Sequence, residues 1–213
     1  IELSTRLIRQ QPAKDGRLVV RTSLPTFAMT VLIPALPRFS ADPAVSVDLV
    51  TSLSAPGIGD VYDVLITRDL MRDNDEHWLL ASETLVCVAA PAVVFDYADK
   101  PLAEWPFLVA KSRPDVLAAW SNQQAIESRT LHVVGSFEHY FLALPAVTAG
   151  MGFLVVPHDL VAELLRLGHL LETPLPAVRG AANYRAYVNP QTPVPEAAKA
   201  FCRWLKSLLK KDS

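Results

Sequence analysis

The stretch Gly135–Leu160 shows the clearest change of hydrophobic pattern in the chain. From Phe137 onward, apolar residues first recur at the spacing of one helix face. Gly150 and Gly152 then end that pattern, and glycine is typical just beyond the last turn of a helix. The short apolar run Phe153–Val156 follows and is typical of a buried strand. We therefore expect a helix, a turn, a strand and a second helix, which is half of a parallel α/β layer.

The same reasoning divides the rest of the chain. Strands are expected at Leu18–Val20, Val45–Val50, Tyr62–Thr67, His77–Ala81, Glu83–Ala90, Phe107–Ala110, Leu131–Val134, Leu170–Thr173 and Tyr184–Val188. Helices are expected at Phe27–Phe39, after Pro114, at Phe137–Ala149, at Leu160–Leu167 and at Ala197–Leu209. Ser54–Asp60, Asp69–Glu76 and Pro174–Gly180 are expected to be loops. Elements of both kinds alternate, so the fold class is α/β, in two layers or lobes.

Two helices carry further signals. Thr26 is a suitable N-cap for the first helix, because its hydroxyl can accept a hydrogen bond from a backbone N–H. Pro34 and Pro37 should kink or restart that helix, since each removes a donor. The last helix has an apolar face and a basic face. We expect it to dock on its own domain, the alternative being a membrane or nucleic-acid helix.

Composition narrows the function. The 213 residues are 51% hydrophobic with a net charge of −2, which allows a large core and gives no sign of nucleic-acid binding by this chain. No run approaches the roughly 18 apolar residues of a membrane span, and no signal peptide is expected. Cys87 and Cys202 are expected to be buried thiols rather than a disulfide.

Signals for catalysis or metal binding are missing. The histidines, His77, His132, His139, His158 and His169, have no metal-ligand spacing. No Gly-x-Ser-x-Gly elbow or phosphate-binding loop occurs. We therefore expect no metal, no cofactor and no catalytic residues.

Polar residues gather where strands are expected to end. Ligands of open α/β sheets bind beyond the carboxyl ends of strands. The candidate ligand-binding residues are Ser23, Thr26, Thr51, Ser52, Thr67, Arg68, Ser112, Phe137 and Glu138. Helix starts after Thr26 and Ser136 would favour an anion, which Arg68 or Arg113 could pair. Glu138 could hold an ammonium. Thr26 could equally be an ordinary cap, and Phe137 a core residue.

Three motifs carry a resemblance to a known family. They are the aromatic-Glu-His sequence at Phe137–His139, the Ala-Gly-x-Gly turn at Ala149–Gly152, and the following apolar run closed by Pro157. Together they resemble the effector-binding domain of LysR-type transcriptional regulators, and most closely the branch of the glycine-cleavage activators. Tyr62–Thr67, with Asp63, is similar to that family's Asp-x-Ala-Ile-Arg segment. No part resembles the family's DNA-binding winged helix.

The resemblance implies an architecture. It implies the two-lobed, type 2 fold of periplasmic binding proteins, with lobe I formed by residues 16–89 and 186–213 and lobe II by residues 90–185. Residues 1–15 would be the end of a linker helix or an added tail. The candidate residues would converge on the cleft between the lobes, with Thr26 and Glu138 facing each other across it.

The resemblance also implies partners. The cleft would bind a small and preferably anionic metabolite. Two domains would pair side by side and antiparallel, and full-length chains would form tetramers in the cytoplasm. DNA would be bound only by the winged helix.

Two alternatives remain open. One is a free solute-binding protein of a transporter, and the other is an enzyme on the same fold, such as an aromatic-acid dehydratase or a deaminase.

Overall fold

The computed structural model describes residues 17–39, 45–52, 56, 60–68 and 76–211. These residues form two compact units. The first comprises the described residues of Ile1–Ala28, Leu32–Ala81 and Asn183–Ser213, and the second comprises Met29–Val31 and Ser82–Ala182. The predicted loop Ser54–Asp60 lies largely outside the described residues, as does most of Asp69–Glu76.

The strands are β1 (Arg17–Thr22), β2 (Ser46–Thr51), β3 (Val64–Arg68), β4 (His77–Ala89), β5 (Pro106–Ala110), β6 (His132–Phe137), β7 (Phe153–Pro157), β8 (Leu171–Glu172) and β9 (Val178–Val188). The helices are α2 (Pro25–Phe27), α3 (Ile33–Ala35), α4 (Pro91–Asp96), α5 (Asp115–Gln123), α6 (Tyr140–Thr148), α7 (Ala162–Arg166) and α8 (Pro195–Lys211). Short helical turns lie at Ala28–Leu32, Leu36–Arg38, Leu102–Glu104, Ser128–Thr130 and His158–Leu160.

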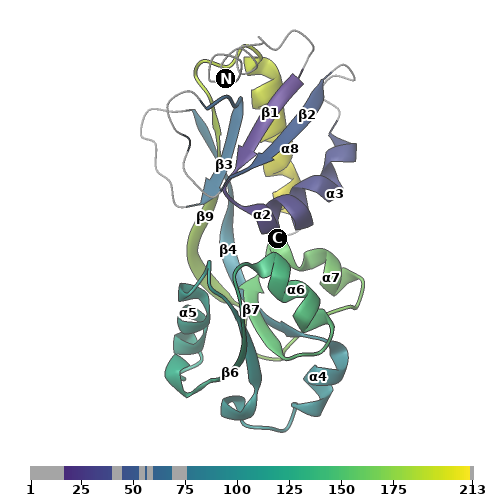
Figure 1. The fold of residues 1–213 in the computed structure, drawn as a ribbon, viewed down its shortest axis with the longest axis vertical. Helices are drawn as coiled ribbons and strands as arrows, with labels where there is room; N and C mark the ends of the chain where they lie inside the picture. The colour runs from purple at the N-terminus through teal and green to yellow at the C-terminus, as the bar shows by residue number, and fades with distance from the viewer. Residues whose placement is uncertain (1–16, 40–44, 53–55, 57–59, 69–75, 212–213) are drawn as a thin grey trace, which may run out of the picture. The chain divides into compact units, whose positions relative to one another are not determined.

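In the first unit the strands run in the order β2-β1-β3-β9 (Figure 1). β1 is parallel to both β2 and β3, and β3 is antiparallel to β9. The carboxyl ends of β1, β2 and β3 therefore lie at one edge of the sheet. This edge is where an α/β sheet places its ligands.

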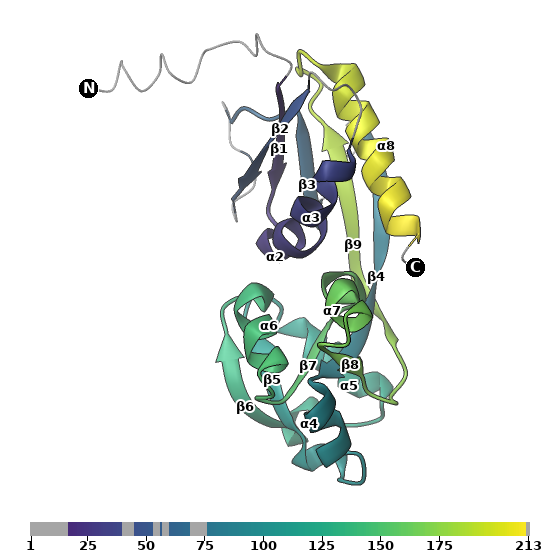
Figure 2. The same cartoon turned by 90° about the vertical axis from the view of Figure 1, so that its right-hand side faces the viewer.

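Helix α8 lies along this sheet, as Figure 2 shows, and confirms the predicted docked helix. Ala198, Phe201, Cys202 and Leu205 are fully buried on its apolar face. Trp204 is only half-buried, and its ring packs against Phe39 and Phe201 at 5.1 and 5.3 Å. Burial of one continuous face explains why this helix could be predicted from its periodicity alone.

The helix after β1 differs from its prediction in its start. Thr26 is not the N-cap: Leu24 holds that position, and Pro25 is the first helical residue. Proline fits there because its missing N–H would have no partner in the first turn. The helical run then continues through Pro34 and Pro37, changing from π-helical to α-helical to 3-10 geometry.

In the second unit the strands run in the order β4-β7-β5-β6, with β8 paired to β4. β5 is parallel to β6 and β7, whereas β4 is antiparallel to β7. Helices α5 and α6 lie on opposite sides of these strands (Figure 1). This follows from right-handed crossovers that step in opposite directions along the sheet.

Glycine is required at the turn between α6 and β7. Gly152 has φ +155°, and a Cβ there would collide with the carbonyl oxygen of Pro106. The neighbouring core is aromatic, because Trp105 stacks on Phe153 with ring centroids 4.2 Å apart. The second glycine of the Ala-Gly-x-Gly sequence thus allows the start of β7 to lie close to Pro106 in β5.

Four other predicted elements need correction. His77–Ala81 and Glu83–Ala90 are one strand, β4, and not a pair. The predicted helix Phe137–Ala149 begins only at Tyr140, because β6 runs on through Phe137. The predicted loop Pro174–Gly180 already contains the start of β9. Helix α4 begins at Pro91, where the end of a strand was the only expectation. In the other three cases a strand is longer than its own hydrophobic pattern indicates, because its pairing with neighbouring strands extends it.

The chain changes unit inside two long strands. The changes fall between Ala81 and Ser82 in β4, and between Ala182 and Asn183 in β9. The lobe limits expected from the sequence, after residue 89 and before residue 186, lie at the end of β4 and within β9. Both crossings therefore belong to strands and not to flexible linkers.

Candidate functional site

The edge of the first unit brings two candidate hydroxyls into contact. Ser23 follows β1 and Thr67 lies near the end of β3, and their hydroxyl oxygens are 3.1 Å apart. The Ser23 N–H also donates to the carbonyl oxygen of Ile66. Parallel pairing of β1 and β3 is what places these residues, 44 positions apart in sequence, side by side.

The other first-unit candidates lie at the same strand ends. Ser52 donates its N–H to the carbonyl oxygen of Thr22 at 3.0 Å, which ties the end of β2 to the end of β1. Thr51 is exposed, and Arg68 is half-buried at the last position of β3. Thr26 is buried in the helix that follows β1. This edge therefore offers several hydroxyls and one guanidinium.

The second unit collects the remaining candidates at the ends of β5 and β6. The Lys111 N–H donates to the carbonyl oxygen of Phe137 at 2.7 Å, and the Ser112 N–H donates to that of Glu138 at 2.9 Å. The Lys111 ammonium lies 3.8 Å from a Glu138 carboxylate oxygen, and both side chains are exposed. Ser112, Phe137 and Glu138 thus belong to two adjoining segments.

Arg113 is not placed to pair with a ligand. Its guanidinium is buried and donates to both carboxylate oxygens of Glu83, at 2.6 and 2.9 Å. It also donates to both oxygens of Asp115, at 3.1 and 2.9 Å. Burial lowers the pKa of Arg113, but the hydrogen bonds that its guanidinium donates to Glu83 and Asp115 outweigh this effect, so the pKa lies above its ordinary value. The suggestion that Arg113 pairs with an anion is therefore wrong.

The predicted helix start after Ser136 is also wrong. Phe137 is the last residue of β6, and Glu138 precedes the N-cap of α6, which is His139. The carbonyl oxygen of His139 accepts hydrogen bonds from Leu142 and Ala143. Glu138 therefore stands in a connecting segment at a strand end, and the ligand contact expected of it has to come from its side chain.

Two polar residues at the same edge were not among the candidates. Lys111 follows β5, and His158 follows β7, which is parallel to β5. His158 lies 3.7 Å from a Glu172 carboxylate oxygen and 3.9 Å from one of Asp159. Both residues could have been found from the sequence, because each comes directly after a predicted strand.

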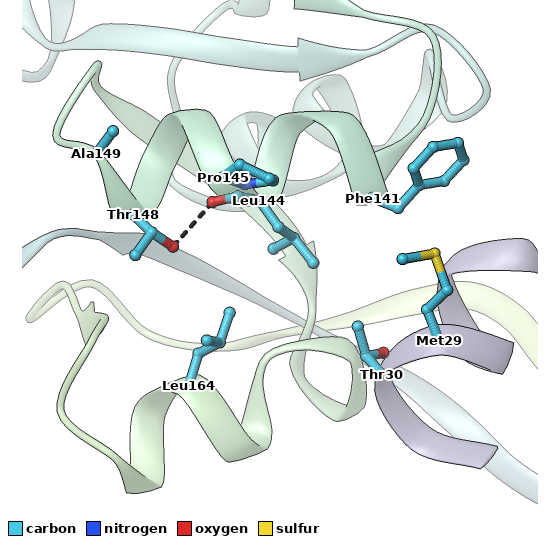
Figure 3. A pocket seen from close by; sticks show the side chains of 8 residues that line it. All are labelled: Met29, Thr30, Phe141, Leu144, Pro145, Thr148, Ala149 and Leu164. Carbon is cyan, nitrogen blue, oxygen red and sulfur yellow. Dashed lines mark hydrogen bonds between the residues drawn. The ribbon is translucent and has the colours of Figure 1, made fainter. Parts of the chain in front are cut away.

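The second unit also carries an apolar pocket of about 490 Å³ (Figure 3). It is lined by Met29, Thr30, Phe141, Leu144, Pro145, Thr148, Ala149 and Leu164. Leu144 and Leu164 point toward each other across it, and the Thr148 hydroxyl donates to the carbonyl oxygen of Leu144 at 2.8 Å. No predicted ligand residue lines this pocket, so it is separate from the strand-end candidates.

Within the described part of the chain, no group of three or more His, Cys, Asp or Glu side chains is arranged to hold a metal ion. In the same residues, no helix has the length and apolar character needed to cross a membrane. Cys87 and Cys202 are buried and free, as predicted.

Comparison with known proteins identifies the family. The model of the LysR substrate binding domain matches residues 12–210. The chain belongs to this family. The recognition made from Phe137–His139 and Ala149–Gly152 is thereby confirmed at the level of the LysR-type regulators. Its assignment to the glycine-cleavage branch stays a prediction.

Individual relatives agree with this membership. The HTH-type transcriptional regulator TrpI of Pseudomonas aeruginosa is 29% identical over 135 residues, which are 61% of this chain and 45% of that protein. The chain thus covers less than half the length of this relative.

Solved structures establish the fold. The effector-binding domain of AmpR from Citrobacter freundii superposes with a TM-score of 0.73 at 22% identity, covering 92% of this chain and 98% of that one. CrgA, a LysR-type transcriptional regulator from Neisseria meningitidis, gives 0.71 at 15% identity, covering 97% and 73%. The predicted type 2 fold of periplasmic binding proteins is confirmed.

Proposed function

We propose that this chain is the effector-sensing domain of a LysR-type transcriptional regulator and that it binds a small metabolite at its strand ends. The family match over residues 12–210 carries this proposal. The paired hydroxyls of Ser23 and Thr67 support it, because they mark a polar site at the carboxyl ends of parallel strands.

The ligand chemistry follows from the side chains at the two edges. Arg68 and the hydroxyls of the first unit would bind an anionic group such as a carboxylate, through charge-assisted hydrogen bonds. In the second unit, the carboxylate of Glu138 would accept from an ammonium or hydroxyl, beside Lys111. An amino acid carries both groups and is the first compound class to test.

A binding role accounts for these residues better than catalysis. General acid–base chemistry needs a positioned pair of groups around one reacting centre. The first-unit candidates are hydroxyls and one arginine, which bind anions but do not form such a pair. We therefore assign the domain a sensing role and no enzymatic activity.

The rest of the proposed regulator follows from the family. Full-length chains would bind DNA through a separate winged helix, assemble from paired domains into tetramers and act in the cytoplasm. A transporter's solute-binding protein is the competing function on this fold. The gene sequence before Ile1 separates them, because a regulator would encode a helix-turn-helix there and a transport protein a signal peptide.

The direct test is a thermal-shift screen of this domain against amino acids, carboxylates and small aromatic acids. A ligand present at one hundred times its Kd should add about 2.7 kcal/mol of stability. Thr67→Val should weaken the binding of the identified compound about tenfold or more, since it removes a hydroxyl that bonds a charged group. Thr130→Val is the matched control, because Thr130 is exposed and its hydroxyl donates to Glu127. Equal binding by both variants would refute the assignment of the strand-end site.

A further inference from the structure

The second unit contains a buried charge cluster that the proposed binding site does not use directly. We call Arg113, Glu83 and Asp115 the Arg113 clamp. Side-chain exposure is 5% for Arg113 and 0% for Glu83, whereas Asp115 is 55% exposed. Four hydrogen bonds join the guanidinium to the two carboxylates, so both the position and the plane of the guanidinium are fixed.

The clamp joins the long strand to the candidate site. Glu83 lies in β4, two residues beyond Ala81, where the chain enters the second unit. Arg113 follows Ser112 directly, and its own N–H donates to the carbonyl oxygen of Ala110 at 2.9 Å. The Lys111–Ser112 segment is therefore held between the end of β5 and a buried ion pair.

The Lys111–Ser112 segment also fixes the segment beside it, Phe137–Glu138. The two N–H groups of Lys111 and Ser112 donate to Phe137 and Glu138. Fixing Arg113 therefore fixes both segments that carry the second-unit candidates.

Gly180 completes the arrangement. It lies in β9, which neighbours β4 in the sheet. A Cβ at this position would lie 2.8 Å from Cγ and 2.9 Å from Cδ of Glu83, and closer still to a carboxylate oxygen. All three nearest atoms belong to Glu83. Any side chain at position 180 would therefore have to displace the carboxylate that Arg113 binds.

Stability alone is a poor explanation for such a cluster. Desolvating a buried ion pair costs about as much as its attraction returns, and replacing one by apolar residues is often neutral. What a bidentate pair supplies is a defined geometry. A defined geometry is what the connecting segments at the strand ends need.

We propose that the Arg113 clamp, with Gly180 beneath it, is a positioning device for the second-unit half of the ligand site. It holds the backbone of Lys111–Ser112, and through it Phe137–Glu138, in a fixed arrangement. This role rests on the proposed function, but the geometry can be tested without any ligand.

The test is hydrogen exchange of the folded domain, followed at individual amides by NMR. In Gly180→Ala, the amides of Lys111 and Ser112 should exchange about tenfold faster or more, because their segment opens locally. The amides of β7, which pair with β5, should change much less. A uniform change across the second unit, or no change at Lys111 and Ser112, would overturn the proposal.

A double-mutant cycle shows whether Gly180 acts through Glu83. Glu83→Ala removes the three atoms that lie nearest to the position of a Cβ at residue 180. Adding Gly180→Ala to Glu83→Ala should therefore cause no further increase in exchange at Ser112. An additive increase would show that Gly180 acts by another route and would contradict the proposal.

Two further variants complete the test. Arg113→Lys keeps the charge but cannot bind a carboxylate through two parallel bonds, so it should also loosen Lys111 and Ser112 selectively. Arg166→Lys is the matched control, since Arg166 makes the same bidentate pair with Glu163 on the exposed surface of α7. It should leave both amides unchanged. Because no compound is added, a negative result here is distinct from a failed ligand screen.

Discussion

At the scale of single residues, Asp63 is a buried carboxylate that two separate donors of the first unit depend on. Its buried carboxylate accepts from the N–H of Val19 at 2.7 Å and from the hydroxyl of Thr192 at 2.5 Å. Asp63→Ala would leave buried donors without partners, at about 1–3 kcal/mol for each. We expect urea unfolding to show a loss of about 2–4 kcal/mol in the free energy of unfolding. Asp96→Ala, at an exposed position in α4, should change it by less than about 0.5 kcal/mol.

The thiol of Cys202 makes stability depend on pH. Burial, followed by the negative charge of Glu76, raises its pKa from 9.0 to about 12. In the unfolded chain the thiol ionises near pH 9, whereas in the folded chain it stays protonated. The contribution of this pKa shift to the free energy of unfolding is therefore fully present below pH 9. It is lost as the pH rises toward 12, by about 1.4 kcal/mol per pH unit. The free energy of unfolding, measured from pH 8 to 11, should fall less steeply in Cys202→Ala than in the unchanged domain. Parallel curves for the two proteins would contradict the burial of this thiol.

The sequence predicted which residues are candidates for the site better than it predicted which residues surround them. Ser23 and Thr67 could be proposed because both stand at expected strand ends, and the structure brings them into contact. Arg113 was misjudged because its partner, Glu83, is 30 positions away in a strand that looked interrupted. The sequence shows that an arginine is present, but only the fold shows which carboxylate its guanidinium binds.

At the scale of elements, α8 tests how packing determines helix stability. Phe201 is fully buried on its apolar face, whereas Trp204 is half-buried against Phe39. Phe201→Ala should cost about 3–5 kcal/mol, and Trp204→Ala less than that. Chemical denaturation of both variants shows directly which substitution lowers the free energy of unfolding more. The reverse order would mean that the helix is rotated from the described packing.

The turn before β7 allows a comparison between two glycines. Gly152→Ala combines an unfavourable φ with a collision against Pro106, and should cost about 3 kcal/mol or more. Gly168 also has a positive φ, +72°, but no atom lies within 4 Å of the position of its Cβ. Gly168→Ala should therefore cost only about 1–2 kcal/mol. Thermal unfolding of the pair separates the collision from backbone strain.

Elements with one buried face could be predicted, and those extended by partners could not. The apolar face of α8 and the Gly152 turn follow from local pattern. The continuity of β4 through Glu83 does not, because a charged residue in a strand normally indicates an exposed end or a break. Here Arg113 neutralises that charge. The start of α6 was misplaced because β6 runs on through Phe137, where the helical spacing of apolar residues was taken to begin.

At the scale of the whole molecule, the α/β class follows from alternating patterns, whereas the division into two lobes was implied by the resemblance to the family. The family follows from short motifs at Phe137–His139 and Ala149–Gly152. The chain passes between the units within the strands β4 and β9, beside Ser82–Glu83 and near Gly180, whereas the limits expected from the sequence, 89 and 186, lie at other positions in the same strands.

Charge at this scale predicts that the domain alone does not bind duplex DNA specifically. The net charge is −2, and Lys199 on the last helix already pairs with Glu76 at 3.1 Å. Because the basic residues of this helix are spread along it and the net charge is negative, little release of counterions is expected to drive binding. An electrophoretic shift assay in low salt should show no sequence-specific complex. A specific complex that weakens as salt rises would contradict the assignment of DNA binding to a separate winged helix.

The two crossings inside β4 and β9 have a consequence for synthesis on the ribosome. Apart from Met29–Val31, the second unit is a single stretch, Ser82–Ala182, and it can fold as soon as that stretch has left the exit tunnel. The first unit needs most of β9 and all of α8, which are made after it. At about 5–20 residues per second, its early strands wait for seconds with their apolar faces uncovered. Translation thus assembles these two units from the middle outward, and the strands of the first unit that are made early are the last to be covered.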